Sequence, residues 1–142
     1  MCSERYEHTH FAHPMTGHRQ FLVIDDNPDS RFLLVKTLLR KFPQSLLQEC
    51  QDSDVALVAA RNPRLDVIVA HRASDVDGPE LVRLLRHTNP DVPIVMVSGL
   101  DRSAVAAEAG ATVFLNYDEW LRIGTVVSDL LSPEDAANPS HR

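Results

Sequence analysis

Five short apolar runs are spaced along the chain so that a helix can fit between each pair. They are FLVID (21–25), SLLQEC (45–50), LDVIVA (65–70), VPIVMVS (92–98) and TVFLN (112–116). Each has the length of a strand, and three of them are almost continuously apolar and rich in β-branched residues. Such runs are typical of parallel strands that are covered by helices on both faces. The pattern therefore predicts an α/β fold.

Segments of helical length, with apolar residues at spacings of three and four, lie between these runs. The first follows Asn27, a suitable N-cap residue, and has Pro28 at its first position. We expect its inward face to be formed by Phe32, Val35, Leu38 and Leu39.

Later helices are predicted over residues 54–61, 78–88, 101–110 and 118–131. The first of these is expected to turn Val55, Leu57 and Val58 inward. The last is expected to bury Trp120, Leu121, Val127, Leu130 and Leu131. Gly124 is expected to weaken that helix by about 1 kcal/mol relative to alanine.

The alternation of strands and helices predicts a (βα)5 doubly wound, five-stranded parallel sheet. We expect one domain over residues 20–131, flanked by tails over 1–19 and 132–142. In such sheets the functional residues gather where the strands end at their carboxyl edge. The candidates at those ends are Asp25, Asp26, Asn27, Ala70, His71, Ser98, Gly99, Asn116 and Tyr117.

Charge and hydropathy narrow the choice of partners. The net charge of −6 is spread along the chain without a Lys/Arg cluster that could neutralise phosphates, so we expect no nucleic-acid partner. No apolar run approaches the roughly 20 residues that span a bilayer, and the N-terminus lacks the apolar segment of a secretory signal. We therefore expect a cytoplasmic protein that acts on protein partners and not at a membrane.

Over nearly all of residues 20–131 the chain resembles the receiver domain of two-component response regulators. The segments that carry the resemblance are FLVIDDNPDSRFLLVKTLLR, DVDGPELVRLLR, PDVPIVMVSG and AGATVFLN. The resemblance implies the flavodoxin-like receiver fold. It also implies a switch in which an acidic pair helps to bind Mg²⁺ and an aspartate at the end of the third strand accepts a phosphoryl group from a histidine kinase. A hydroxyl on the fourth strand and a lysine on the fifth strand then contact that group.

Only part of this machinery carries over to the present chain. Asp25 and Asp26 match the acidic pair, and Ser98 matches the hydroxyl. The acceptor position falls on His71 when counted from the third strand, and on Ala70 when counted back from the following loop. Neither residue is a carboxylic acid.

The lysine position is also changed, because it falls on Tyr117. Receiver phosphorylation needs a carboxylate that forms the acyl phosphate and a cation that holds the new charge. The expected positions supply neither. The sequence therefore predicts a degenerate pseudo-receiver with a pocket formed by Asp25, Asp26, His71, Ser98 and Tyr117.

His71 admits several interpretations. A neutral imidazole could hydrogen-bond Asp25 or Asp26 and reduce the repulsion between the two acids. It could instead act as a pH sensor, since nearby carboxylates raise the pKa of a histidine. It could complete a transition-metal site with the two aspartates. Finally, His71 could be an unorthodox phosphoacceptor, with Asp75 as the other nearby candidate.

The remaining pocket residues leave similar alternatives open. Asp25 and Asp26 could bind Mg²⁺ or another divalent metal weakly, or could form an inherited acidic pocket filled by water or a neighbouring group. No other cofactor is expected. Ser98 could contact a ligand or cap the next loop. Tyr117 could cover the pocket or lie on the surface.

Two features lie outside the pocket. The histidines His8, His10, His13 and His18 could bind a metal, or could belong to a disordered tail. Phe114, at the aromatic switch position of the family, and Trp120 fall on or beside the face of the fourth helix, fifth strand and fifth helix that receivers use for dimers and partners. Each could be an interface anchor or part of the core.

These observations favour a stand-alone receiver-like domain, not an enzyme, that acts by phosphorylation-independent protein–protein interaction in a bacterial two-component or related pathway. Its partner would be a histidine kinase, a regulator or another signalling protein, or a second copy in a homodimer through the face just described. Two alternatives remain open. One is a metal, pH or small-ligand sensor that uses the acidic pocket, and the other is a receiver with an unorthodox phosphoacceptor.

Overall fold

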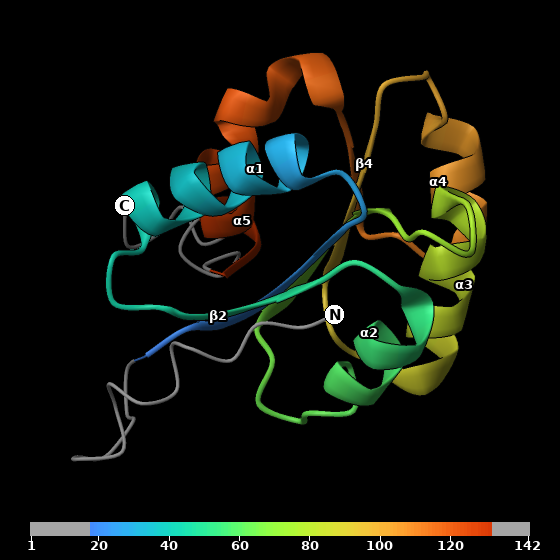
Figure 1. Ribbon diagram of the computed structural model, residues 1–142, viewed down its shortest axis with the longest axis horizontal. Coiled ribbons are helices and arrows are strands. Elements are labelled where there is room, and N and C mark those ends of the chain that lie inside the picture. Colours follow the sequence, from blue (N-terminus) through green and yellow to red (C-terminus); the bar gives the residue numbers. More distant parts are fainter. Residues whose placement is uncertain (1–17, 132–142) are drawn as a thin grey trace, which may run out of the picture.

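The computed structural model describes residues 18–131 and contains one parallel sheet of five strands in the order β2-β1-β3-β4-β5 (Figure 1). The fold is the flavodoxin-like receiver fold that the sequence predicts. Residues 1–17 and 132–142, which include His8, His10 and His13, lie outside the described residues. The strands are β1 (Gln20–Asp25), β2 (Leu46–Cys50), β3 (Val67–Arg72), β4 (Ile94–Ser98) and β5 (Val113–Asn116).

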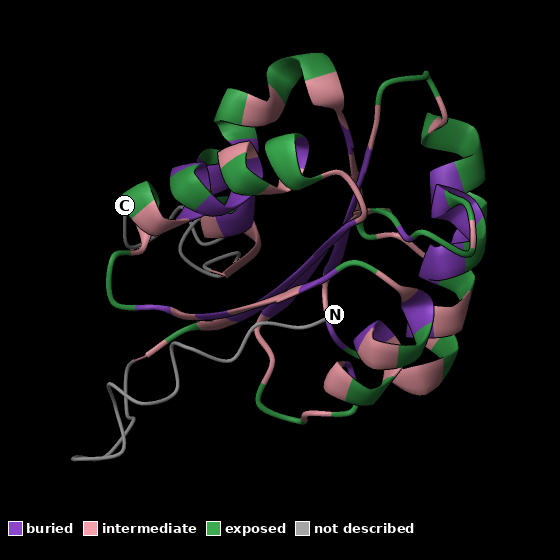
Figure 2. Cartoon of the chain, in the orientation of Figure 1, coloured by how far each residue is buried: buried purple, intermediate pink, exposed green. Residues whose placement is uncertain are grey.

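Helices cover both faces of the sheet, as Figure 1 shows. One face carries α1 (Pro28–Lys41) and α5 (Ile123–Leu131), which is preceded by the 3₁₀ helix η2 (Tyr117–Arg122). The other carries α2 (Ser53–Ala59), α3 (Gly78–Thr88) and α4 (Ser103–Ala109). The strands between these two layers are mostly buried, and the outer faces of the helices are exposed (Figure 2). Between residues 18 and 131, no helix is long and apolar enough to cross a membrane.

The junction of β1 and α1 forms as its local sequence predicts. The Oδ1 atom of Asn27 accepts hydrogen bonds from the backbone N–H groups of Asp29 (2.8 Å) and Ser30 (3.1 Å), and Pro28 occupies the first turn. The expected burial of Phe32 is wrong, since this side chain is 58% exposed. The buried face contains Ser30, Leu34, Val35, Thr37 and Leu38. This rotation of the helix allows the Ser30 hydroxyl to reach the Asp25 carboxylate.

Two other side chains that were expected to face inward are exposed. Val58 in α2 is 61% exposed, because the buried stripe of that short helix runs through Ser53, Ala56 and Ala60. Leu121 is 63% exposed, because the predicted single helix over 118–131 begins as a 3₁₀ helix. A 3₁₀ helix has three residues per turn, so the α-helical spacing does not apply to its first residues.

Gly124 lowers the helix propensity of α5, but it is needed for the packing of α5 against α1. It is buried where α5 crosses α1, and a Cβ atom added to it would lie 3.0 Å from Cβ of Lys41 and 3.6 Å from the Thr37 carbonyl oxygen. The absence of a side chain therefore permits the two helices to approach closely.

The third strand extends two residues beyond its predicted end. Ile24 pairs with Ala70, whereas the next residue, Asp25, pairs with Arg72. The register shift leaves His71 as an extra residue, as in a β-bulge. This irregularity lies at the carboxyl edge of the sheet, next to the side chains that form the candidate site.

Candidate functional site

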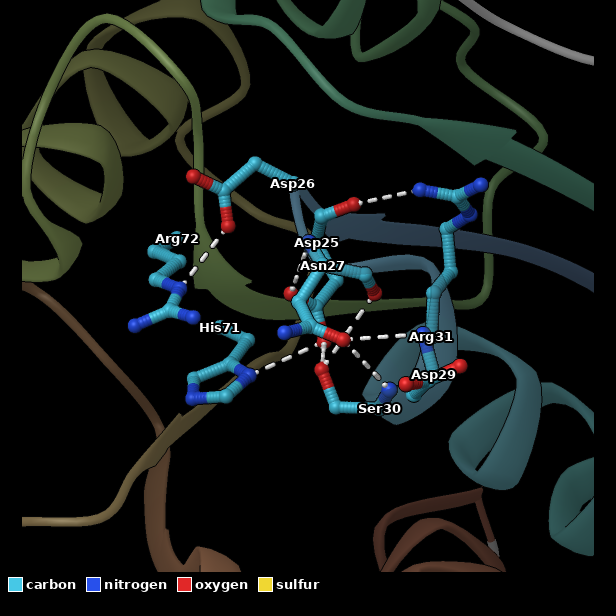
Figure 3. Close-up of polar contacts among 8 residues, drawn as sticks. All are labelled: Asp25, Asp26, Asn27, Asp29, Ser30, Arg31, His71 and Arg72. Atoms are coloured by element: carbon cyan, nitrogen blue, oxygen red, sulfur yellow. Dashed lines mark hydrogen bonds and ion pairs between the residues drawn. The ribbon is translucent and has the colours of Figure 1, made fainter.

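Asp25 is the centre of the polar cluster at the end of β1 (Figure 3), and its side chain is fully buried. Its Oδ1 atom accepts a hydrogen bond from the backbone N–H of Asn27 at 3.0 Å. Its Oδ2 atom accepts hydrogen bonds from the Ser30 hydroxyl and from Nδ1 of His71, which lies 2.9 Å away. Donors from this chain therefore contact both carboxylate oxygens.

The alternation of side chains along β3 explains why His71 reaches Asp25. Val67 and Val69 face the core beneath α1 and α5, and Ala70 faces the opposite core, where it is fully buried. The His71 side chain is 11% exposed and meets Asp25. Of the two residues that the sequence leaves open for the acceptor position, only His71 directs a side chain at the acidic pair. The hydrogen bond expected from the sequence is thus present, and it selects Asp25.

The Tyr117 ring stacks on the His71 ring. The two rings are nearly parallel, with an interplanar angle of 8° and ring centroids 5.2 Å apart. Burial raises the pKa of the Tyr117 phenol above its ordinary value, and the negative charges of Asp25 and Asp29 raise it further. Tyr117 is therefore an uncharged phenol at neutral pH and does not supply the cation that a lysine would place here.

The second acid, Asp26, is paired with an arginine that the sequence reasoning missed. The Nε atom of Arg72 lies 2.8 Å from Oδ1 of Asp26, and the Asp26 N–H donates to the Arg72 carbonyl oxygen at 3.1 Å. Both side chains are partly exposed, so the pair adds little stability. Its consequence is electrostatic, because it offsets one of the two negative charges. The available signal was a basic residue that directly follows His71 at the same strand end.

Ser98 lies apart from the Asp25 cluster. Its hydroxyl oxygen accepts a hydrogen bond from the backbone N–H of Leu100 at 3.1 Å, which is the loop-capping role that the sequence left open. Ser98 also lines a neighbouring cavity of about 450 Å³, together with His71, Arg72 and Arg102. Asp25, His71 and Tyr117 thus contact one another in series. Ser98 lies apart from these contacts, in the wall of the neighbouring cavity.

Asp75, the alternative acceptor, has a structural task in the loop after β3. Its carboxylate accepts hydrogen bonds from the Ser53 hydroxyl and from the Ser53 N–H, the latter at 3.0 Å. These bonds lower the pKa of Asp75 below its ordinary value, and the hydroxyl makes the largest contribution. In the same loop, the N–H of Ser74 donates to the carbonyl oxygen of Gln51 at 2.9 Å. Asp75 therefore fixes this loop to the start of α2.

The residues present do not fit the magnesium centre that the resemblance implies. Mg²⁺ is held through carboxylate oxygens in nearly octahedral geometry. Here protein donors occupy Asp25, Arg72 pairs with Asp26, and the third-strand position carries an imidazole. No group of three or more His, Cys, Asp or Glu side chains within residues 18–131 could hold a metal ion. The geometry therefore does not favour the metal interpretation of Asp25, Asp26 and His71.

The predicted interface aromatic residues are partly buried. Phe114 packs against the core beneath α2, α3 and α4, and Trp120 packs against the core beneath α1 and α5. The exposed large apolar side chains near them are Leu100, Val105 and Leu121. His18, the one tail histidine that the structure describes, has its Nδ1 atom 2.7 Å from the carbonyl oxygen of Gln44.

Comparison with known proteins agrees with the fold. The profile of the response regulator receiver domain matches residues 21–116. The nitrogen assimilation regulatory protein NtrX of Azorhizobium caulinodans is 31% identical over 98 residues, which are 66% of this chain and 22% of that protein. The chain thus spans about a fifth of the length of this curated relative.

Solved structures show the same similarity. The receiver domain of NtrX from Brucella abortus has a TM-score of 0.64 and 26% identity, covering 78% of this chain and 97% of that one. A response regulator protein from Burkholderia pseudomallei, solved with a phosphorylated aspartic acid, calcium and citrate, has a TM-score of 0.62 and 25% identity. That match covers 85% of this chain and 75% of the other.

Proposed function

This chain belongs to the response regulator receiver domain family, and we propose that it regulates a partner protein by direct contact rather than by accepting a phosphoryl group. The observation that carries the proposal is the hydrogen bond between His71 and the buried Asp25 carboxylate. The imidazole of His71 stands at the position where the acyl phosphate would form. It also hydrogen-bonds Asp25, the aspartate that would help to hold the metal.

The chemistry of the other pocket residues supports the same conclusion. A phosphorylated carboxylate carries new negative charge that needs a nearby cation. The chain's lysines, Lys36 and Lys41, both lie in α1, and the fifth-strand position carries the uncharged Tyr117. The cation at the acidic pair is Arg72, and its charge is paired with Asp26. Of the two carboxylates in the loop after β3, Asp75 is engaged by Ser53, and Asp77 caps α3 by accepting from the Glu80 N–H. A pseudo-receiver with a constitutive conformation accounts for these replacements.

The surface of α4, β5 and η2 is the interaction face that we propose. Leu121 is 63% exposed and Val105 is 38% exposed, and exposed apolar side chains are favoured anchors at interfaces. The partner is a signalling protein of a two-component pathway, such as a histidine kinase or a regulator, or a second copy of this chain. The domain is not an enzyme in this proposal, and it works in the cytoplasm.

A phosphorylation assay tests the central claim. The full chain is incubated with radiolabelled acetyl phosphate and Mg²⁺, and separately with a phosphorylated histidine kinase, beside a receiver that has an acceptor aspartate. We expect label on the control receiver and none on this chain. Stable label on this chain would contradict the proposal, and loss of that label in His71→Ala or Asp75→Ala would identify the unorthodox acceptor.

The interaction face has its own test. The mass of the full chain in solution is measured by light scattering, and the Leu121→Ser variant is compared with Val58→Ser, which removes an equally exposed side chain from α2. If the face forms a homodimer, only Leu121→Ser will lower the mass. If both variants and the wild-type chain are monomers, the homodimer is excluded.

A further inference from the structure

A cavity of about 450 Å³ lies next to the Asp25 cluster, in the range of volumes that small-molecule sites occupy. It is bounded by the end of β3, the start of α3, the end of β4 and the residue that precedes α4. Polar groups from three of these segments reach it, namely His71 and Arg72, Ser98, and Arg102. Its other walls include Ala73, Val76 and the fully buried Met96.

The charges around this cavity favour an anion. Arg72 uses its Nε atom to pair with Asp26, and its terminal nitrogens point away from that acid (Figure 3). The side chain of Arg102 makes no hydrogen bond or ion pair with any residue in the described part of the chain. Among the lining residues the carboxylate is Asp77, whose Oδ1 atom already accepts from the N–H of Glu80 at 3.0 Å. The residues that line the cavity therefore include two arginines, of which the Arg102 side chain has no partner in the described part of the chain, and one carboxylate that already accepts a hydrogen bond.

Neutral polar groups add to this preference. The Ser98 oxygen accepts from the Leu100 N–H, which leaves its hydroxyl hydrogen available to donate into the cavity. Arginine and hydroxyl donors together suit the oxygens of a phosphate or carboxylate group. The partly exposed Val76 provides a place for a compact apolar group beside the oxyanion.

We propose that this cavity binds a small organic oxyanion, with its phosphate or carboxylate group held by Arg102, Arg72 and Ser98 and its apolar part against Val76. The binding is non-covalent and uses neither the acceptor position nor a metal. The ligand would give the domain a role beyond partner contact. Because Arg102 directly precedes α4, binding would affect the α4 surface next to the site.

The test is an NMR titration of the isotope-labelled full chain at constant ionic strength with three probes. Phenyl phosphate and benzoate distinguish the two oxyanions, and benzyl alcohol supplies the ring without a charge. We expect saturable shifts at the amides of Gly78, Gly99, Leu100 and Arg102 with one or both anions. Benzyl alcohol should bind at least roughly tenfold more weakly, since charge-assisted hydrogen bonds are the stronger ones.

Two variants test whether Arg102 and Ser98 bind the anion. Arg102→Gln should weaken binding of the preferred anion roughly tenfold, and Ser98→Ala should weaken it less. Arg61→Gln changes the net charge equally at an exposed position outside the cavity, so its affinity should be unchanged.

The proposal is overturned if neither anion gives saturable shifts, if benzyl alcohol binds as tightly as the anions, or if Arg102→Gln binds as the wild type does. The spectrum of each variant shows whether it is folded. None of these results depends on phosphoryl transfer, so they stand apart from the radiolabel assay.

Discussion

Nδ1 of His71 lies 2.9 Å from Oδ2 of the fully buried Asp25 carboxylate. A buried carboxylate is costly without hydrogen bonds or an opposite charge. His71 and Ser30 supply such partners from within the chain, so Asp25 has no need of a metal ion. At the position where the resemblance places the acceptor, His71 therefore both lacks a carboxylate and contacts Asp25 through a hydrogen bond.

Replacing His71 by aspartate should reverse this relationship. His71→Asp places a second carboxylate against Asp25, and we expect a loss of about 3 kcal/mol in the free energy of unfolding without metal. Millimolar Mg²⁺ should recover part of this loss, because paired carboxylates are suitable magnesium ligands. The measurement is urea denaturation with and without MgCl₂.

The control for that experiment is His71→Asn. Its amide can donate to Asp25 without adding a charge, so its stability should not respond to Mg²⁺ beyond the response of the wild type. If Mg²⁺ stabilises the wild-type chain as strongly as His71→Asp, the histidine does not block the metal and our reading of the pocket is wrong.

Tyr117 should titrate at higher pH than an ordinary tyrosine. Burial is the main cause of its raised pKa, and the charges of Asp25 and Asp29 add to it. The folded state keeps the phenol proton at a pH where the unfolded chain has lost it. The resulting stability is fully present below the ordinary pKa of about 10 and is lost as pH rises through the higher folded pKa.

The difference in phenolate absorbance between the wild type and Tyr117→Phe isolates this titration. Phenylalanine retains the ring that stacks on His71, so the variant should remain folded. Its stability should fall less than that of the wild type above pH 10. A Tyr117 midpoint at or below the ordinary value would show that the ring is not held beside the acids.

The sequence predicted contacts that follow from local signals or from strand order. Asn27 and Pro28 begin α1 as expected, because capping depends on neighbouring residues. Asp25 and His71 were expected to meet, because parallel strands end at the same edge of the sheet. The rotation of α1 was missed at Phe32, since it depends on burial across the whole helix.

The pairing of Arg72 with Asp26 could not be predicted in the same way. It depends on the register shift that places Asp25 opposite Arg72 and leaves His71 between paired residues. A bulge has no dependable local signal in a short apolar strand. The exposure of Leu121 has a similar origin, because the sequence pattern does not distinguish a 3₁₀ start from a continuous α-helix.

The pKa of Asp75 should rise toward its ordinary value when Ser53 loses its hydroxyl. Ser53→Ala removes the hydrogen bond that contributes most to the lowered value and keeps the backbone N–H that also donates. A lowered pKa in the folded state gives stability above the unfolded pKa that is lost as pH falls through the folded value. Ser53→Ala should therefore lose less stability on acidification than the wild type.

NMR titration of the Asp75 carboxyl carbon measures this change directly. Ser45→Ala is the matched control, because Ser45 is also buried and its hydroxyl donates to the carbonyl oxygen of Phe42 rather than to an acid. An Asp75 pKa that is identical in Ser53→Ala and the wild type would mean that the hydroxyl does not hold this loop.

Substitution of Gly110 should destabilise the fold for two reasons, the backbone conformation and the lack of space for a side chain. Its φ of 111° lies in the left-handed region, and an added Cβ atom would come within 2.9 Å of Cγ of Arg86. Arg86 donates from Nε to the Gly110 carbonyl oxygen at 3.0 Å and from Nη1 to that of Val92 at 2.6 Å, so its side chain has little freedom to move. We expect Gly110→Ala to lower the free energy of unfolding by about 1–2 kcal/mol, of which the backbone conformation alone supplies most.

Gly99→Ala provides the comparison that separates local geometry from a general effect of glycine replacement. No atom lies within 4 Å of a Cβ atom at Gly99, and its φ is not in the left-handed region. Its stability in urea denaturation should equal or slightly exceed that of the wild type, since alanine restricts the unfolded chain. A Gly110→Ala variant as stable as the wild type would show that Arg86 yields to the methyl group and that the turn after α4 tolerates a side chain.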